Sequence, residues 1–178
     1  GGAFFGLDNL SFTDARAPAQ TSEFGPAYQG GGVITVTTAA DTDDGDTTSI
    51  ASLLGNPGAD RLISLREAMT AVNNTVNAGG NPDTIRFAIA TTDSGYVDPT
   101  PGSPLSGDEY WTIAPTSALP SLTQAVVIDA STQAGYTSTP VIEINGTSAG
   151  GGINGINFSA GSDGSTIRAM AVNRFDGS

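Results

Sequence analysis

The sequence predicts a mainly β protein, a right-handed parallel β-helix (solenoid) with one short N-terminal capping helix. Apolar strand markers recur every 14 residues at Ile128, Ile142, Ile156 and Met170, as expected for stacked repeats. The strands are apolar at consecutive positions, as in 126–128, which is typical of parallel sheets. Two-residue hairpin signals are scarce. A β-sandwich also has regular short strands, but the second and third observations favour the solenoid.

The composition excludes several classes of function. The 178 residues include 18 acidic side chains and 6 Arg but no Lys, His or Cys, which gives a net charge of −12. This charge argues against binding of nucleic acids or anionic membranes, because both need clustered basic residues. Without His or Cys, a structural zinc site, a disulfide, a Cys nucleophile and a Ser-His-Asp triad are all excluded. A basic partner or a cation remains open.

The low charge content indicates an extracellular protein. Only 13% of the residues are charged, against about 25% in an average domain. Thr, Ser, Asn and Gly must therefore cover much of the surface. The chain begins at Gly1 without Met, and it ends directly after a strand-like stretch. We expect a processed or fragmentary piece of a longer secreted chain, located outside the cell or on its surface.

Composition divides the chain into three parts. Residues 1–13 hold three of the seven Phe and predict a tethered β-strand with apolar side chains on both faces. This strand is interpreted as the tail of a preceding domain or as a donor strand. Residues 14–32 contain Pro18, Pro26 and three consecutive Gly, and they predict a linker. Residues 33–178 are expected to form the capped start of a β-helix domain.

One helix is marked clearly by its N-terminal signals. Ser64 precedes Glu67 by three residues, and in such a capping box each side chain accepts a bond from a backbone N–H at the helix start. The apolar stripe that follows consists of Leu65, Ala68, Met69 and Val72. We expect a helix of about ten residues that covers the end of a sheet with its apolar face.

The remaining regular structure is expected to be short strands separated by turn residues. The expected strands are 33–38, 84–89, 110–113, 125–129, 141–145, 153–158 and 166–172.

Three separated motifs, in this order, resemble the CSLREA-type opening of large bacterial secreted proteins. They are residues 34–45 (ITVTTAADTDDG), 63–69 (ISLREAM) and 83–87 (DTIRF). Three further segments look like the first coils of the β-helices that follow this opening. They are residues 128–136 (IDASTQAGY), 140–146 (PVIEING) and 165–168 (STIR). The resemblance covers roughly residues 33–178.

The resemblance implies a secreted or surface multidomain protein, often adhesin-like or anchored to the cell, with the β-helix as a stalk or scaffold. It implies no catalytic residues. The sequence departs from the family at Ile63, where a Cys is usual, and it also lacks the upstream partner Cys. The family disulfide is therefore absent, and the loop at 41–62 must be held by packing, hydrogen bonds or a cation.

Four carboxylates lie within six residues at the start of this loop, at Asp41, Asp43, Asp44 and Asp46. Carboxylate oxygens at this density are typical ligands of Ca²⁺. The loop lacks the Gly and the bidentate Glu of an EF-hand at their usual positions. The alternative is a solvated acidic turn between two strands, so a Ca²⁺ site here is a hypothesis.

Arg66 lies on the polar side of the predicted helix, near Glu67 and within reach of the acidic loop. A lone Arg in a chain without Lys or His has no partner for general acid/base work. We expect a structural ion pair that fixes the helix to the loop.

A long loop at 91–108 leads into Tyr110 and Trp111. The carboxylates around this loop belong to Asp93, Asp98, Asp108 and Glu109. A carboxylate pair beside an exposed aromatic ring would suit a glycosidase or a sugar-binding site. The alternative is a surface insertion with one of the two aromatic rings packed inside.

These observations favour a non-enzymatic extracellular structural or adhesive protein. We expect a β-helix stalk, or a subunit of a fibre or surface layer, that assembles through its N-terminal strand and its open coil end. The expected partners are further copies, neighbouring domains or glycans, with no nucleic acid, no membrane insertion and no cofactor other than Ca²⁺. The alternative is a carbohydrate-active β-helix enzyme, a polysaccharide lyase or hydrolase, or a carbohydrate-binding module, because fold alone does not decide function.

Overall fold

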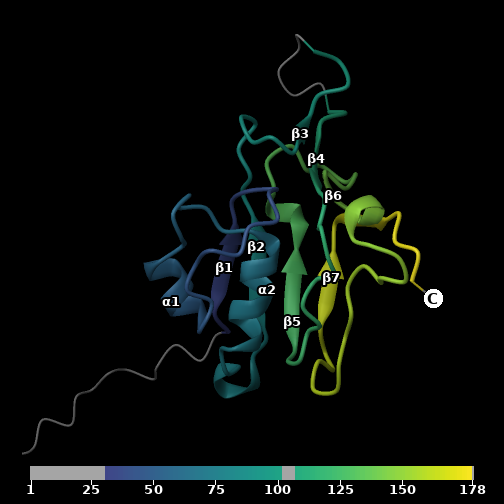
Figure 1. Ribbon diagram of the computed structural model, residues 1–178. Coiled ribbons are helices and arrows are strands. Elements are labelled where there is room, and N and C mark those ends of the chain that lie inside the picture. The colour runs from purple at the N-terminus through teal and green to yellow at the C-terminus, as the bar shows by residue number, and fades with distance from the viewer. Residues whose placement is uncertain (1–30, 102–106, 178) are drawn as a thin grey trace, which may run out of the picture.

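The computed structural model describes residues 31–101 and 107–177, which fold around two β-sheets (Figure 1). In chain order, the strands and α-helices are β1 (Val33–Val36), α1 (Ile50–Gly55), α2 (Leu65–Asn73), β2 (Asp83–Phe87), β3 (Tyr96–Val97), β4 (Tyr110–Ile113), β5 (Val126–Asp129), β6 (Ile142–Asn145), β7 (Thr166–Arg168) and β8 (Met170–Asn173). The short 3-10 helices are η1 (Ala78–Gly80), η2 (Ala130–Thr132) and η3 (Gly146–Ser148).

Each sheet contains four strands. Sheet A has the order β1-β2-β5-β7, and all its neighbouring strands are parallel. Sheet B has the order β3-β4-β6-β8, in which β3 is antiparallel to β4 and the other pairs are parallel. From β4 onward, successive strands alternate between the two sheets. Because paired strands are in register, side chains at equivalent positions form rows that cross each sheet.

These rows supply much of the core. In sheet A, Ile34, Ile85 and Ile128 are each 0% exposed and lie side by side on adjacent strands. In sheet B, Ile113 and Ile144 are equally buried neighbours. Full burial of one such side chain stabilises the fold by roughly 2 kcal/mol. The core therefore runs across the sheets, and the two helices pack against it.

Helix α2 confirms the sequence prediction. Ser64 caps it, and the capping box with Glu67 is complete. The helix spans nine residues, and its apolar side, including Met69 and Val72, is buried. It covers β1 and β2, as Figure 1 shows.

Helix α1 was not predicted. Ser49 begins it by accepting a hydrogen bond from the backbone N–H of Ser52, and Ile50 and Leu53 are its buried residues. Two apolar residues spaced by three give too short a pattern to distinguish one helical turn from a loop. The short helix therefore owes its stability to tertiary packing.

The prediction of a mainly β fold, a right-handed parallel β-helix (solenoid), is wrong. The described residues form a mixed α/β protein with two small four-stranded sheets, mostly parallel, and with α1 and α2 between β1 and β2. Strand β3 is antiparallel to its neighbour. Of the predicted strand 153–158, only Phe158 forms an isolated bridge, to Leu122. The prediction of parallel pairing was correct. Parallel strands require only a crossover that returns the chain in the same direction, and a helical connection provides this as well as a β-helix coil does.

The predicted strand at 166–172 is divided into β7 and β8. Ala169 lies between them with a φ of 63°, in the left-handed region that side chains with a Cβ seldom adopt. This residue breaks the strand and sends the chain from sheet A to sheet B. The apolar pattern alone does not reveal such a break, because Ala is not a turn residue.

The two ends of the sheets are covered differently. Helix α1 lies beside β1 (Figure 1), and Ile50 lies close to Gly32 at the start of that strand. At the opposite end, β7 and β8 have a hydrogen-bonded neighbour on one side only within the described residues. We call the outer edges of β7 and β8 the uncovered end.

The predicted strand at 1–13 and residues 14–30 of the predicted linker lie outside the described residues. Among the residues that the structure describes, no helix is both long enough and apolar enough to cross a membrane.

Candidate functional site

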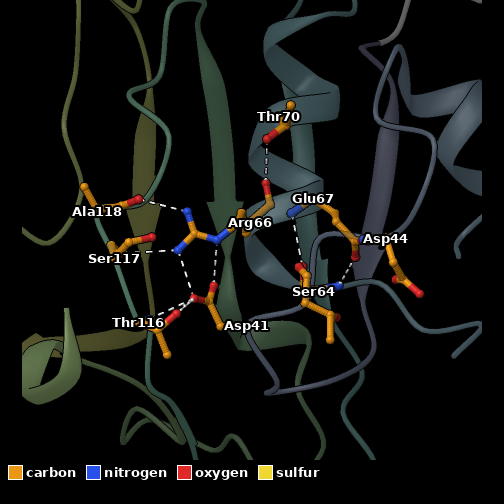
Figure 2. A network of polar contacts seen from close by, with 10 residues as sticks. Asp41, Asp44, Ser64, Arg66, Glu67, Thr70, Thr116, Ser117 and Ala118 are labelled. Carbon is orange, nitrogen blue, oxygen red and sulfur yellow. Dashed lines mark hydrogen bonds and ion pairs between the residues drawn. The ribbon is translucent and has the colours of Figure 1, made fainter. Parts of the chain in front are cut away.

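The acidic loop is fastened to helix α2 by an ion pair (Figure 2). The Nε of Arg66 donates to Oδ1 of Asp41 at 2.8 Å, and Nη2 donates to Oδ2 at 2.9 Å. Thr116 adds bonds from its backbone N–H and its hydroxyl to Oδ2 of the same carboxylate. Burial opposes ionisation of Asp41, but the bonds from Arg66 and Thr116 outweigh it and lower the pKa of this carboxyl. The expected role of Arg66 as a structural ion-pair partner is confirmed.

Arg66 also joins the helix to a distant loop. Its Nη1 donates to the carbonyl of Ala118 at 2.8 Å, and Nη2 donates to the carbonyl of Ser117 at 3.2 Å (Figure 2). The guanidinium thus binds one carboxylate and two backbone carbonyls in its planar fork, an arrangement that Lys would not reproduce. Arg66 therefore ties Ser117 and Ala118 to α2.

Glu67 fastens the other side of the same loop. It is 0% exposed. Its Oε1 accepts the backbone N–H groups of Asp44 at 2.9 Å and Gly45 at 2.8 Å, and its Oε2 accepts that of Ser64 at 2.9 Å. Sequence reasoning identified Glu67 only as a capping residue and missed its bonds to the loop, which no spacing rule reveals. These bonds and the Arg66 ion pair hold the loop in a chain that has no Cys.

The remaining carboxylates of the loop serve local turns. Oδ2 of Asp44 accepts the backbone N–H of Ala59 at 2.8 Å. Oδ1 of Asp46 accepts the hydroxyl and the backbone N–H of Thr48, and these bonds lower the pKa of Asp46. Asp43 is exposed. The structure therefore does not bring the predicted Ca²⁺ ligands Asp41, Asp43, Asp44 and Asp46 together as one set, and a cation here remains a hypothesis.

A different acidic group is compact enough to share a cation. Among the described residues, one carboxylate oxygen from each of Asp98, Asp108 and Glu109 lies within 4.8 Å of the others. These groups have partners of their own: Thr100 bonds to both aspartates, and the backbone N–H of Gly107 donates to Glu109. Burial, together with these three carboxylates, raises the pKa of the nearby Tyr96.

The proposed sugar site is not assembled as the sequence suggested. Asp93 lies apart from the group, since its Oδ2 accepts the hydroxyl of Thr38 at 2.8 Å. Trp111 is 1% exposed. Its Nε1 donates to the carbonyl of Ala90 at 3.0 Å, and its ring packs 5.1 Å from that of Tyr96. A ring so enclosed cannot stack on a sugar, and within 31–101 and 107–177 no pocket is found.

At the uncovered end, apolar side chains are exposed or half-buried, although their neighbours in the same rows are buried. Ile113 and Ile144 are 1% and 0% exposed, whereas Val172, the next residue in their row, is 42% exposed. Ile167 continues the buried row of sheet A but is itself only half-buried. Each row is thus interrupted at the point where a further strand would complete its burial.

A charged pair marks the edge of β7. The Nη2 of Arg168 donates to Oδ2 of Asp129 at 2.6 Å, and the side chain of Arg168 is 60% exposed. The bond from Arg168 is the main cause that lowers the pKa of Asp129 to about 2; bonds from Ser131 assist, and burial opposes. The guanidinium is therefore anchored on one side and faces solvent on the other.

Comparisons of the chain with protein-family models, with curated proteins and with solved structures found no match. The fold and the site alone define the class of protein: a mixed α/β protein in which β7 and β8, the last strands of the two sheets, each pair with one neighbour only within the described residues.

Proposed function

We propose that this chain is a non-enzymatic extracellular structural protein, a subunit of a fibre or surface layer. It associates with its neighbours by strand addition at the uncovered end. Unpaired N–H and C=O groups on an edge strand are a template for another strand, and β7 and β8 present two such edges at the same end of the molecule.

The observation that carries the proposal is the abrupt change in burial at the last row. Val172 is 42% exposed although its row neighbours Ile113 and Ile144 are almost completely buried. Removing such a side chain from water stabilises a contact by about 1 kcal/mol. One added strand on each sheet would bury Ile167 and Val172 and satisfy the backbone groups together.

Composition supports an extracellular setting. The chain has no Cys, 13% charged residues and abundant Gly, Ser and Thr, and its motifs resemble secreted surface proteins. The acidic loop is held by Arg66 and Glu67, and the carboxylate of Asp41 has a structural role in that contact. Trp111 is buried, so it does not provide the exposed aromatic ring that a sugar-binding module would use.

A substitution at the exposed apolar residue of β8 tests the proposal. Val172→Lys places a charge on the uncovered end at a side chain that is already 42% exposed, and Lys on an edge strand discourages strand addition. Val76→Lys is the matched control, because Val76 is 83% exposed and lies between α2 and η1. We expect wild type and Val76→Lys to associate with increasing concentration and Val172→Lys to stay monomeric.

Sedimentation velocity and negative-stain electron microscopy of the full chain measure this outcome. A wild-type chain that is monomeric at every concentration would contradict the proposal. Association of Val172→Lys equal to that of wild type would do the same.

A further inference from the structure

The rows of side chains that cross sheet A indicate which strand would fit beyond β7. One row is aliphatic throughout and consists of Ile34, Ile85, Ile128 and Ile167. The row beside it begins with Thr35 and then alternates in charge through Arg86, Asp129 and Arg168. Neighbouring side chains on one face of a sheet interact directly, and opposite charges favour pairing. A strand beyond β7 would therefore continue both rows if it carried an aliphatic residue followed by an acidic residue.

Arg168 is available for such a partner. Its Nη2 binds Asp129, but its side chain is 60% exposed, and a guanidinium has five N–H donors in a planar fork. A second carboxylate can therefore bind the solvent side without displacing Asp129. Ile167, next to it, is half-buried, and among the described residues no strand pairs with β7 on its outer side.

The chain contains a segment with the required order of residues. Residues 1–30 precede the described part, and their acidic residues are Asp8, Asp14 and Glu23. Among these, only Asp8 directly follows an aliphatic residue, Leu7. The pair Leu7-Asp8 repeats the order Ile128-Asp129 of β5, the strand that pairs with β7 from its inner side. It also lies within the strand predicted at 1–13.

We propose that residues 4–12 of one copy add as a parallel strand to the outer edge of β7 in a neighbouring copy, with Leu7 beside Ile167 and Asp8 beside Arg168. This inference rests on the proposed function and names the partner that the uncovered end receives. The segment of one copy binds the β7 edge of another copy, and these are different surfaces, so the contact is heterologous. Repetition of such a contact builds an open chain of copies.

The length of chain before β1 permits this contact. The connection at 14–32 has 19 residues, with an extended reach of about 60 Å at roughly 3.3 Å per residue. A four-stranded sheet is only about 15 Å wide, because strands lie about 4.8 Å apart. The segment can therefore reach a neighbouring copy while β1 stays in its own sheet.

Charge reversals in the full chain test the pairing. Asp8→Arg and Arg168→Asp each place like charges at the contact, and we expect either one to weaken association by about tenfold or more. The double variant restores opposite charges and should associate as wild type does. Asp14→Arg is the matched control outside the segment and should change nothing. Sedimentation velocity measures association, and thermal melting by circular dichroism verifies that Arg168→Asp folds.

A mixture of the two single variants distinguishes contact between copies from contact within one copy. The mixture contains an intact Asp8 on one variant and an intact Arg168 on the other, so association should return. A mixture that stays monomeric would overturn the proposal, because the segment would then bind within its own copy. If Arg168→Asp does not fold, Asp8→Arg still tests the contact against Asp14→Arg, because both lie outside the described residues.

The failure of this inference is distinguishable from the failure of the proposed function. If Val172→Lys abolishes association while Asp8→Arg leaves it unchanged, the uncovered end associates but its partner is not residues 4–12. If neither substitution changes association, both the inference and the proposed function are wrong.

Discussion

The buried carboxylates of this protein differ in how completely their oxygens are bonded. Glu67 accepts three backbone N–H groups, and Asp129 accepts bonds from Arg168 and Ser131. Asp83 is also buried, at 1% exposed, but only its Oδ1 is bonded, to the backbone N–H of Gly32. Its Oδ2 is buried without a hydrogen-bond partner. A buried polar atom left unpaired costs about 1 to 3 kcal/mol.

Asp83 is expected to make the protein less stable as the pH rises. Burial raises the pKa of its carboxyl, and the bond from Gly32 opposes this only in part. Since the pKa in the folded state is raised, the protonated form is favoured, and the advantage present below the ordinary pKa is lost as the pH rises through the folded value. Asp83→Asn removes this titration, so its unfolding free energy should rise relative to that of wild type as the pH increases from 4 to 7.

Urea unfolding at these two pH values measures the difference. Asp163→Asn, at an exposed position, controls for the loss of one negative charge and should leave the pH dependence of stability unchanged. Identical pH dependence in wild type and Asp83→Asn would contradict this account of the buried oxygen.

At the same scale, the sequence predicted the partners of the loop only in part. The spacing of Ser64 and Glu67 specified a capping box, and the polar position of Arg66 indicated an ion pair; both are present. The four aspartates suggested one cation site, whereas Asp41, Asp44 and Asp46 bond to separate partners and Asp43 is exposed. Contacts such as Thr116 with Asp41 join residues that are 75 positions apart, and local patterns contain no information about such distances.

At the level of elements, helix α2 and the acidic loop depend on each other through Glu67. One carboxylate satisfies the helix start at Ser64 and the loop backbone at Asp44 and Gly45. A substitution at Glu67 therefore affects both the helix and the loop, whereas a substitution at a residue that only caps a helix would affect the helix alone.

Glu67→Gln is expected to destabilise the fold by about 2 kcal/mol. The amide nitrogen cannot accept a hydrogen bond, so at least one buried backbone N–H loses its partner. Thr70→Ala is the matched control on the same helix, because the hydroxyl of Thr70 bonds only the carbonyl of Arg66, which the helix already uses. Its effect should stay within about 0.5 kcal/mol. Chemical denaturation measures both, and equal losses would contradict the special role of Glu67.

Elements with strong local signals were predictable, and those that depend on tertiary contacts were not. The β-branched run at β1 and the capped, amphipathic α2 were found from sequence. Helix α1 was missed because only Ile50 and Leu53 mark its buried face. The break between β7 and β8 was missed because Ala169 adopts a left-handed conformation, which an Ala in the sequence does not predict.

For the whole molecule, the first strands of sheet A are covered by helices, whereas β7 and β8 form the uncovered end. Helices α1 and α2 cover β1 and β2, whereas β7 and β8 lack outer neighbours among the described residues. The sequence predicted the parallel pairing and a helix near the first strands. It did not predict the mixed α/β architecture, because apolar spacing shows that strands pair but not how the chain connects them.

Amide hydrogen exchange of the full chain at increasing protein concentration tests the central claim most directly, since it reports on the edges themselves. In dilute solution, amides of β7 and β8 should exchange faster than those of β1, β2 and β5, because the outer strands open more easily. Protection at β7 and β8 should then rise with concentration while β2 stays unchanged. Association without any new protection at 166–173 would contradict the claim that this end of the molecule is its assembly surface.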